Sequence, residues 1–292
     1  MVGDADDEAL ALLSRLRGRF QGALLGLALG EALAAPAVLG RPGMFPPVRD
    51  LIGGGPHDLP RGAWGDDTAL ALCVAQSLIE QGACDPDDQL ARYRRWQRDG
   101  ENSATGECIG IGAGTARALV AGRPDAAVAD DAASLSCVVP LALRYWADEV
   151  RLQAAVRDAI AVTCHDPATF DAATRFASML SAALRGAPIA EVALRSGDGS
   201  DGVGRGAPMQ ALAAAARAST EGSGWKDIVL RAINRGGPAD TVGAFAGAIA
   251  GATLGIEAVP AAWVAALARR EDIAGLADRL LAEALVGLAD PA

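Results

Sequence analysis

The chain lacks the residues that mark several large classes of protein. Its 292 residues include five cysteines, an odd number without CxxC spacing, which argues against a disulfide framework or a zinc ribbon. A net charge of −10 leaves no excess of lysine and arginine for nucleic acid or an anionic membrane as the main partner. The acidic segment Met1–Glu8 predicts no ordinary signal peptide, and unpaired thiols fit a cytoplasmic protein.

Two apolar runs could be mistaken for membrane spans. The run Gly22–Gly40 is interrupted by Glu31 and Pro36, and the run Val242–Ile256 is shorter than the about 20 residues that a spanning helix needs. We therefore expect both segments to be buried helices, and we expect no membrane partner.

Alternating β-branched residues are nearly absent, whereas Ala, Leu, Arg and Glu dominate, so the chain is predicted to be all-α. Nothing in residues 1–292 marks a domain boundary, so a single domain is expected. Two predicted helices carry glycines at a spacing of four, in Gly22–Gly30 and in Gly243–Gly255. Each series lines one helix face without side chains and predicts close backbone packing. The Gly- and Pro-rich segment Leu39–Gly65 is predicted to be a long functional loop.

Two predicted helix starts present oxygen ligands. Asp66-Asp67-Thr68 opens one apolar helix, and Asp240-Thr241 opens another about 170 residues later. Helix capping is the simplest explanation of each start, because Asp and Thr accept backbone N–H bonds there. If the starts meet, Asp66, Asp67, Asp240 and Thr241 form an all-oxygen set that suits Mg²⁺ or Mn²⁺ better than zinc.

Two further features are weaker evidence of a binding site. Gly110, Gly112 and Gly114 lie in a glycine-rich turn before a predicted helix that begins at Thr115, and its N–H groups could hold a phosphate. An ordinary loop is the competing interpretation. His165 could contact substrate or be an exposed residue at a helix end. Since no Ser-His-Asp or Cys-His arrangement stands out, water activated by carboxylates or by a metal is the expected nucleophile.

Several segments together resemble the ADP-ribosylglycohydrolase family, in order and spacing, from about residue 18 to 265. They are the helix Gly22–Leu33, the acidic start Trp64–Thr68, the loop with Gly112, Thr115 and Arg117, the central His165, and the second acidic start Asn234–Ala244. The resemblance implies a compact orthogonal helical bundle with a two-metal centre in a cleft for ADP-ribose. It implies hydrolysis of a ribosyl N- or O-glycosidic bond, by metal-assisted attack of water at the anomeric carbon.

The chain departs from the family pattern at several places near the metals and the substrate, and Gly110 and Ala113 replace two acidic residues of the glycine-containing loop. Gly65 stands where the family has a Thr or Ser ligand, Pro238 where it has an Asp, and Val38 where it has a Glu. The substrate segment reads Ala132-Ala133-Ser134-Leu135-Ser136-Cys137, which leaves Ser134 as its candidate contact. The remaining carboxylates are expected to hold one metal ion rather than two.

Three functions follow as alternatives. The leading one is a hydrolase of ADP-ribosylated, nucleotide-like or smaller ribosylated substrates, with Asp66, Asp67 and Glu31 as catalytic residues and one Mg²⁺ or Mn²⁺. Gly110, Gly112, Gly114, Thr115, Ser134 and His165 would bind substrate. The second is a non-catalytic protein that binds ADP-ribose or a nucleotide and has lost the metal centre. The third is a metal-independent glycosidase with Glu31, Asp66 or Asp67 as general base.

Overall fold

The computed structural model describes residues 2–124, 132–197 and 206–289. Within these ranges the regular structure is helical, apart from one isolated bridge between Gly54 and Leu59. The α-helices are α1 (Val2–Ala34), α2 (Asp66–Gln81), α3 (Pro86–Asp99), α4 (Ala113–Ala121), α5 (Val138–Tyr145), α6 (Glu149–Ile160), α7 (Pro167–Leu184), α8 (Ile189–Leu194), α9 (Ala207–Glu221), α10 (Trp225–Ile233), α11 (Ala239–Leu254), α12 (Ala261–Ala266) and α13 (Arg270–Ala289). Short 3-10 turns are η1 (Ala35–Ala37), η2 (Ala132–Cys137) and η3 (Ile256–Ala258). The all-α prediction is confirmed.

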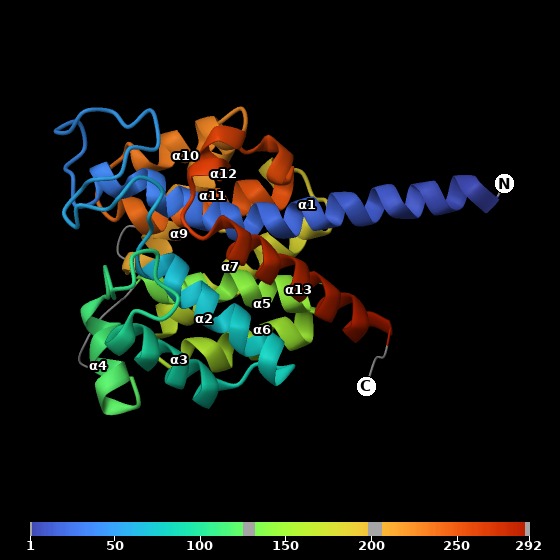
Figure 1. Ribbon diagram of the computed structural model, residues 1–292, viewed down its shortest axis with the longest axis horizontal. Helices are drawn as coiled ribbons and strands as arrows, with labels where there is room; N and C mark the ends of the chain where they lie inside the picture. Colours follow the sequence, from blue (N-terminus) through green and yellow to red (C-terminus); the bar gives the residue numbers. More distant parts are fainter. Residues whose placement is uncertain (1, 125–131, 198–205, 290–292) are drawn as a thin grey trace.

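Helices α1 and α11 cross the centre of the molecule side by side and antiparallel (Figure 1). A Cβ placed on Gly22, Gly26 or Gly30 would lie 2.4, 2.3 or 2.0 Å from the carbonyl oxygen of Gly251, Gly247 or Gly243, respectively. Those distances leave no space for any side chain. The predicted close packing of the two glycine faces is therefore confirmed, and the two backbones touch along three turns.

The remaining helices surround this central pair. Helix α11 is buried along nearly its whole length and also packs against α7, α9 and α10. The Trp225 indole of α10 donates to the Gly247 carbonyl oxygen over 3.0 Å, and the rings of Phe176 and Phe245 join α7 to α11 at 4.7 Å between centroids. Because the small residues of α11 bring its neighbours close, few aromatic residues are needed to fill the core.

One helix in the described ranges, Asp7–Ala37, is long and apolar enough to cross a membrane by length and composition alone. Its apolar window is 89% buried inside the protein, which is the environment of a core helix. Residues Val242–Ala252 of α11 are buried in the same way, whereas Leu254 at its end is exposed. The prediction of buried helices is therefore confirmed for Gly22–Ala34 and Val242–Ala252, but the ends of both predicted segments lie outside the buried helical parts, with Leu39 and Leu254 exposed.

The site lies where three helix ends meet. Helix α1 ends at Ala34, while α2 begins at Asp66 and α11 begins at Ala239 beside that end. The long segment between η1 and α2 is irregular, as predicted, and its backbone pairs with the approach to α11 through Leu39 N–H to Gly237 O (3.1 Å). At the opposite end of the molecule, the first turns of α1 and the last turns of α13 project outward (Figure 1).

Candidate metal centre

Three buried carboxylates meet at this junction. One oxygen from each of Glu31, Asp66 and Asp67 lies within 4.8 Å of the other two. Glu31 comes from the last turns of α1, and both aspartates come from the first turn of α2. All three side chains are buried. Because burial disfavours an isolated carboxylate, three together require a compensating positive charge or protons.

Glu31 holds the start of α2 in place. One of its oxygens accepts the N–H groups of Gly65 (2.9 Å) and Asp67 (3.2 Å). The other accepts the N–H (2.9 Å) and the hydroxyl (2.5 Å) of Thr68. The helix has no side-chain cap from Gly65, which is its N-cap residue. Glu31 therefore supplies from α1 the acceptor that a Ser or Thr N-cap would supply locally.

Asp67 is the most enclosed member of the cluster, with no exposed surface. Its two oxygens accept hydroxyl hydrogen bonds from Ser136 of η2 (2.5 Å) and Thr241 of α11 (3.0 Å). The two acidic helix starts thus come together at Asp67 and Thr241, a meeting that the sequence allowed but did not establish. Two hydroxyl donors from different elements fix the orientation of this carboxylate.

Asp240 lies at the edge of the cluster. It is half-buried in the first turn of α11, and one of its oxygens accepts the N–H of Thr241 over 3.0 Å. Its charge reaches both Glu31 and Asp67 and raises the pKa of each. The compact triad nevertheless contains Glu31 in place of Asp240, so the acidic set differs from the predicted one by one member.

Burial and mutual repulsion change the protonation of the cluster. Burial, followed by the charge of Asp240, raises the pKa of Glu31 from 4.5 to about 7, although the hydrogen bonds from Thr68 and Gly65 oppose this. Burial, with the charges of Glu31 and Asp240, holds the pKa of Asp67 well above its ordinary value. Glu31 and Asp67 therefore hold their protons to higher pH in the metal-free cluster than separate carboxyls would, and a bound cation would favour the release of these protons.

The donor set fits a hard divalent cation. It consists of carboxylate and hydroxyl oxygens and contains neither histidine nor thiolate, so magnesium or manganese suits it better than zinc. The first turn of α2 provides two carboxylates in succession, which is one more than capping requires. The residues present could therefore hold a metal ion.

Two glycines shape the cluster's walls. A Cβ on Gly65 would lie 3.0 Å from an oxygen of Glu31, and a Cβ on Gly110 would lie 2.6 Å from an oxygen of Asp66. Gly110 also has φ of +85°, a conformation that other residues rarely adopt. The carboxylates thus occupy the space into which side chains at these two positions would grow.

The predicted phosphate loop lies directly beside the carboxylates. Gly110 contacts Asp66, and α4 begins three residues later with Gly112 as its N-cap. Thr115 is buried in the first turn of α4. Ser134 is buried in η2, the element that also supplies Ser136, and η2 packs against α2. The loop, Thr115 and Ser134 therefore lie on elements that reach the cluster.

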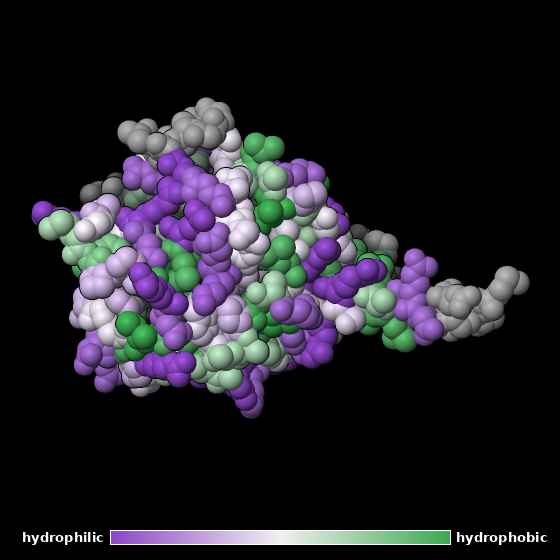
Figure 2. Space-filling view, turned by 90° about the horizontal axis from the view of Figure 1, so that it is seen from above, coloured by the Kyte–Doolittle hydropathy of each residue, from purple (hydrophilic) through white to green (hydrophobic). Residues whose placement is uncertain are grey.

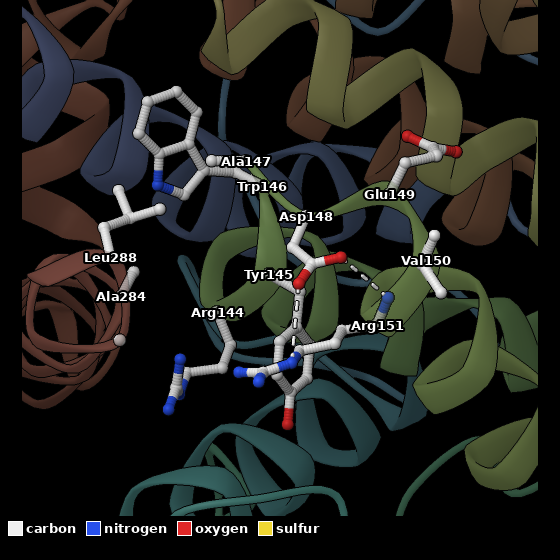
Figure 3. Close-up of a pocket in the computed structure, with 11 residues that line it drawn as sticks. Arg144, Tyr145, Trp146, Ala147, Asp148, Glu149, Val150, Arg151, Ala284 and Leu288 are labelled. Atoms are coloured by element: carbon white, nitrogen blue, oxygen red, sulfur yellow. Dashed lines mark hydrogen bonds and ion pairs between the residues drawn. The ribbon is translucent and has the colours of Figure 1, made fainter. Parts of the chain in front are cut away.

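His165 lies elsewhere. It is exposed and lines a surface cavity of about 380 Å³ together with Asp87, Arg123 and Asp158. A second cavity of about 360 Å³ is formed by the turn between α5 and α6 and by the end of α13 (Figure 3). Its lining includes Arg144 and Trp146 but none of the predicted site residues.

Sequence reasoning missed Ser136. Its hydroxyl hydrogen bond to Asp67 depends on η2 lying across α2, a long-range contact that no local pattern predicts. The only available signal was the presence of two serines, Ser134 and Ser136, in an otherwise apolar segment.

The fold and the acidic cluster agree with the comparisons to known proteins. The ADP-ribosylglycohydrolase family model matches residues 12–288, so the chain belongs to the ADP-ribosylglycohydrolase family.

Among its relatives is ADP-ribosylarginine hydrolase Tri1 of Pseudomonas putida (strain GB-1), which is 32% identical over 90% of this chain and 77% of that protein. ADP-ribosyl-[dinitrogen reductase] glycohydrolase of Rhodospirillum rubrum is 25% identical over 92% of this chain and 97% of that protein. A solved structure titled "ADP-ribosylglycohydrolase-related protein complex" superposes with a TM-score of 0.81 at 35% identity, over 93% of this chain and 99% of that one.

Proposed function

We propose that this protein hydrolyses the N-glycosidic bond between ADP-ribose and an arginine side chain, in a protein or a smaller compound. The observation that carries the proposal is the buried triad of Glu31, Asp66 and Asp67 at the junction of α1, α2 and α11. Two relatives are ADP-ribosylarginine hydrolases, which supports arginine as the linked residue. The non-catalytic alternative has no comparable support, since binding alone does not require this acidic cluster.

Asp66 and Asp67 are the proposed ligands of one Mg²⁺ or Mn²⁺, with Asp240 and Thr241 at its edge. When bound, such an ion supplies positive charge and lowers the pKa of water at the reacting bond. Asp67 is held for this role by the hydroxyls of Ser136 and Thr241. The remaining carboxylate charge would stabilise the positive charge that develops on the sugar as the leaving group departs.

Glu31 is proposed to act through α2 as a positioning residue. Its two oxygens already accept four hydrogen bonds from Gly65, Asp67 and Thr68, which leaves little capacity for a metal ion. Two divalent cations carry four positive charges. Because Glu31 is bonded to the start of α2, the carboxylates left to bind metal are Asp66, Asp67 and Asp240. Their three negative charges fit one divalent ion better than two.

The glycine turn is proposed to bind the phosphates of the substrate. Gly110, Gly112 and Gly114 lead into the N-terminus of α4, where N–H groups and the helix dipole favour anions. Because Gly110 touches Asp66, a phosphate held at this turn would bring the attached ribose close to the carboxylates. Thr115 and Ser134 are proposed to contact the same substrate, and His165 a more remote part of it.

The test is release of ADP-ribose from defined substrates. We expect turnover of ADP-ribosyl-arginine with Mg²⁺ or Mn²⁺, and loss of turnover in EDTA or in the Asp67→Asn variant. Asp99→Asn, which alters an exposed aspartate paired with Arg98, is the matched control and should retain activity. Turnover that persists in EDTA would favour a metal-independent glycosidase. No release from arginine, serine or small riboside conjugates would contradict the proposal.

A further inference from the structure

The projecting end of α1 exposes an apolar surface. Residues 7–15 are all exposed, and five consecutive members, Ala9–Leu13, have no polar side chain. Leu10 and Leu12 are 63% and 62% exposed. This end extends away from the body of the protein (Figure 1), and the space-filling view shows apolar patches beside polar ones on it (Figure 2). A helical end of this length is marginal in water without a packing partner, because helices gain most of their stability from a buried face.

The end of α13 widens this surface. Arg17 and Gln21 of α1 both bind Asp278 of α13, at 2.6 and 2.9 Å, so the two helices are joined where they leave the body. Beyond that point α13 exposes Val286 (65%) and Leu288 (49%). The two helix ends then diverge (Figure 1). Together they present apolar side chains at the end of the molecule that lies away from the carboxylate cluster.

The charged residues on either side of the apolar segment of α1 indicate which partner would bind it. The first turns carry acidic residues, with Asp7 and Glu8 nearest the apolar segment, and the turns after that segment carry Arg15, Arg17 and Arg19. Arg15 is exposed and forms no ion pair with another residue in the described ranges. Arg17 is already paired with Asp278 of its own chain. An identical helix laid antiparallel would bring its Glu8 beside Arg15 and its leucines beside the leucines. A parallel arrangement would place like charges together.

We propose that this surface binds a second copy of the same chain. The two α1 ends pack antiparallel about a two-fold axis near Leu12, flanked by the ends of α13. Each contact then occurs twice, with Glu8 of each copy beside Arg15 of the other, as an isologous interface requires. The interface is separate from the carboxylate cluster, so the proposal does not depend on the proposed function.

Sedimentation and light scattering of the full chain test the proposal. We expect a particle of twice the 29.6 kDa chain mass. Leu12→Asp should give a monomer, because it places a charge at the two-fold axis. The matched control is Leu194→Asp, which alters a leucine of α8 that is 74% exposed and outside the surface, and it should remain a dimer. A wild-type protein that stays monomeric at every concentration would overturn the proposal.

A charge exchange tests the antiparallel arrangement itself. Glu8→Arg or Arg15→Glu alone should raise the dimer Kd about tenfold, since two symmetry-related contacts change from attractive to repulsive. The double variant Glu8→Arg/Arg15→Glu restores the pairing between copies and should recover the wild-type Kd. Failure of the double variant to recover, with helix content unchanged by circular dichroism, would contradict the antiparallel arrangement. Binding of a different protein by a chain that remains monomeric would also contradict it.

Discussion

Replacing Asp67 by Asn should affect stability and metal binding in opposite directions. Asp67 is fully buried, and the charges of Glu31 and Asp240 add to burial in raising its pKa well above the ordinary value. Without metal, burial and these charges therefore shift this carboxyl toward its protonated form. Asn closely imitates the protonated acid in size and hydrogen bonding. In EDTA, we expect the variant to unfold at the same temperature as the wild type or at a higher one.

The metal response should be lost in the same variant. A ligand that binds only the native state at about a hundred times its Kd stabilises it by about 2.7 kcal/mol. For a domain of this size, about 2 °C of Tm per kcal/mol gives a rise of about 5 °C. We expect this rise in the wild type with excess Mg²⁺ or Mn²⁺. We expect no measurable rise in Asp67→Asn, because the amide replaces a charged ligand.

Differential scanning fluorimetry with EDTA, Mg²⁺ or Mn²⁺ measures both effects. The Asp99→Asn control should show the wild-type response to metal, because Asp99 is an exposed aspartate outside the cluster. Two results would refute the reasoning. One is a metal-dependent rise of Tm in Asp67→Asn equal to that of the wild type. The other is a Tm of Asp67→Asn in EDTA that lies far below the Tm of the wild type in EDTA. That result would show that the charged form of Asp67 stabilises the metal-free fold.

Three further predictions concern pH, packing and orientation. The pKa of Glu31 is about 7 in the fold against 4.5 ordinarily, so the native state holds its proton more tightly. Unfolding experiments in EDTA should therefore show stability falling by about 3 kcal/mol as pH rises from about 4.5 to 7; stability that rises over this range would contradict the assignment. A Cβ on Gly247 would lie 2.0 Å from a carbonyl oxygen of α1, so Gly247→Ala should cost about 3 kcal/mol or more by urea unfolding, whereas Gly275→Ala, with open space around it, should be neutral or stabilising by about 1 kcal/mol. Ser136→Ala removes a donor to the central carboxylate and should lower kcat about tenfold or more, while Ser219→Ala, which removes a buried hydroxyl bonded within α9, should leave kcat unchanged.

Helical periodicity was sufficient to predict the fold class, and glycine spacing was sufficient to predict two closely packed helix faces, but only the structure shows that these two faces pack against each other. The series Gly22–Gly30 and Gly243–Gly255 predicted close backbone approach, and the structure pairs Gly22, Gly26 and Gly30 with Gly251, Gly247 and Gly243. Such a pattern is informative because only glycine tolerates a carbonyl oxygen at the position of its missing Cβ. Element boundaries are less predictable: the apolar segment Ala132–Tyr145 is divided between the 3-10 turn η2 and helix α5, a division that no local signal marks.

The candidate site was only partly predictable. The acidic starts of α2 and α11 carry local signals, so Asp66, Asp67 and Thr241 could be proposed from the sequence. The position of Glu31 beneath α2 depends on the packing of α1, and Ser136 approaches Asp67 only through the long-range placement of η2. Side chains that meet through tertiary contacts have no fixed spacing in the sequence.

The central claim is that Asp66 and Asp67 hold a divalent cation beside bound ADP-ribose. The most direct measurement is anomalous scattering from a crystal grown with Mn²⁺ and ADP-ribose. We predict one manganese peak about 2.2 Å from oxygens of both aspartates, with the ribose beside it and the phosphates at the turn Gly110–Gly114. Ordered ADP-ribose with no manganese at these carboxylates would contradict the account.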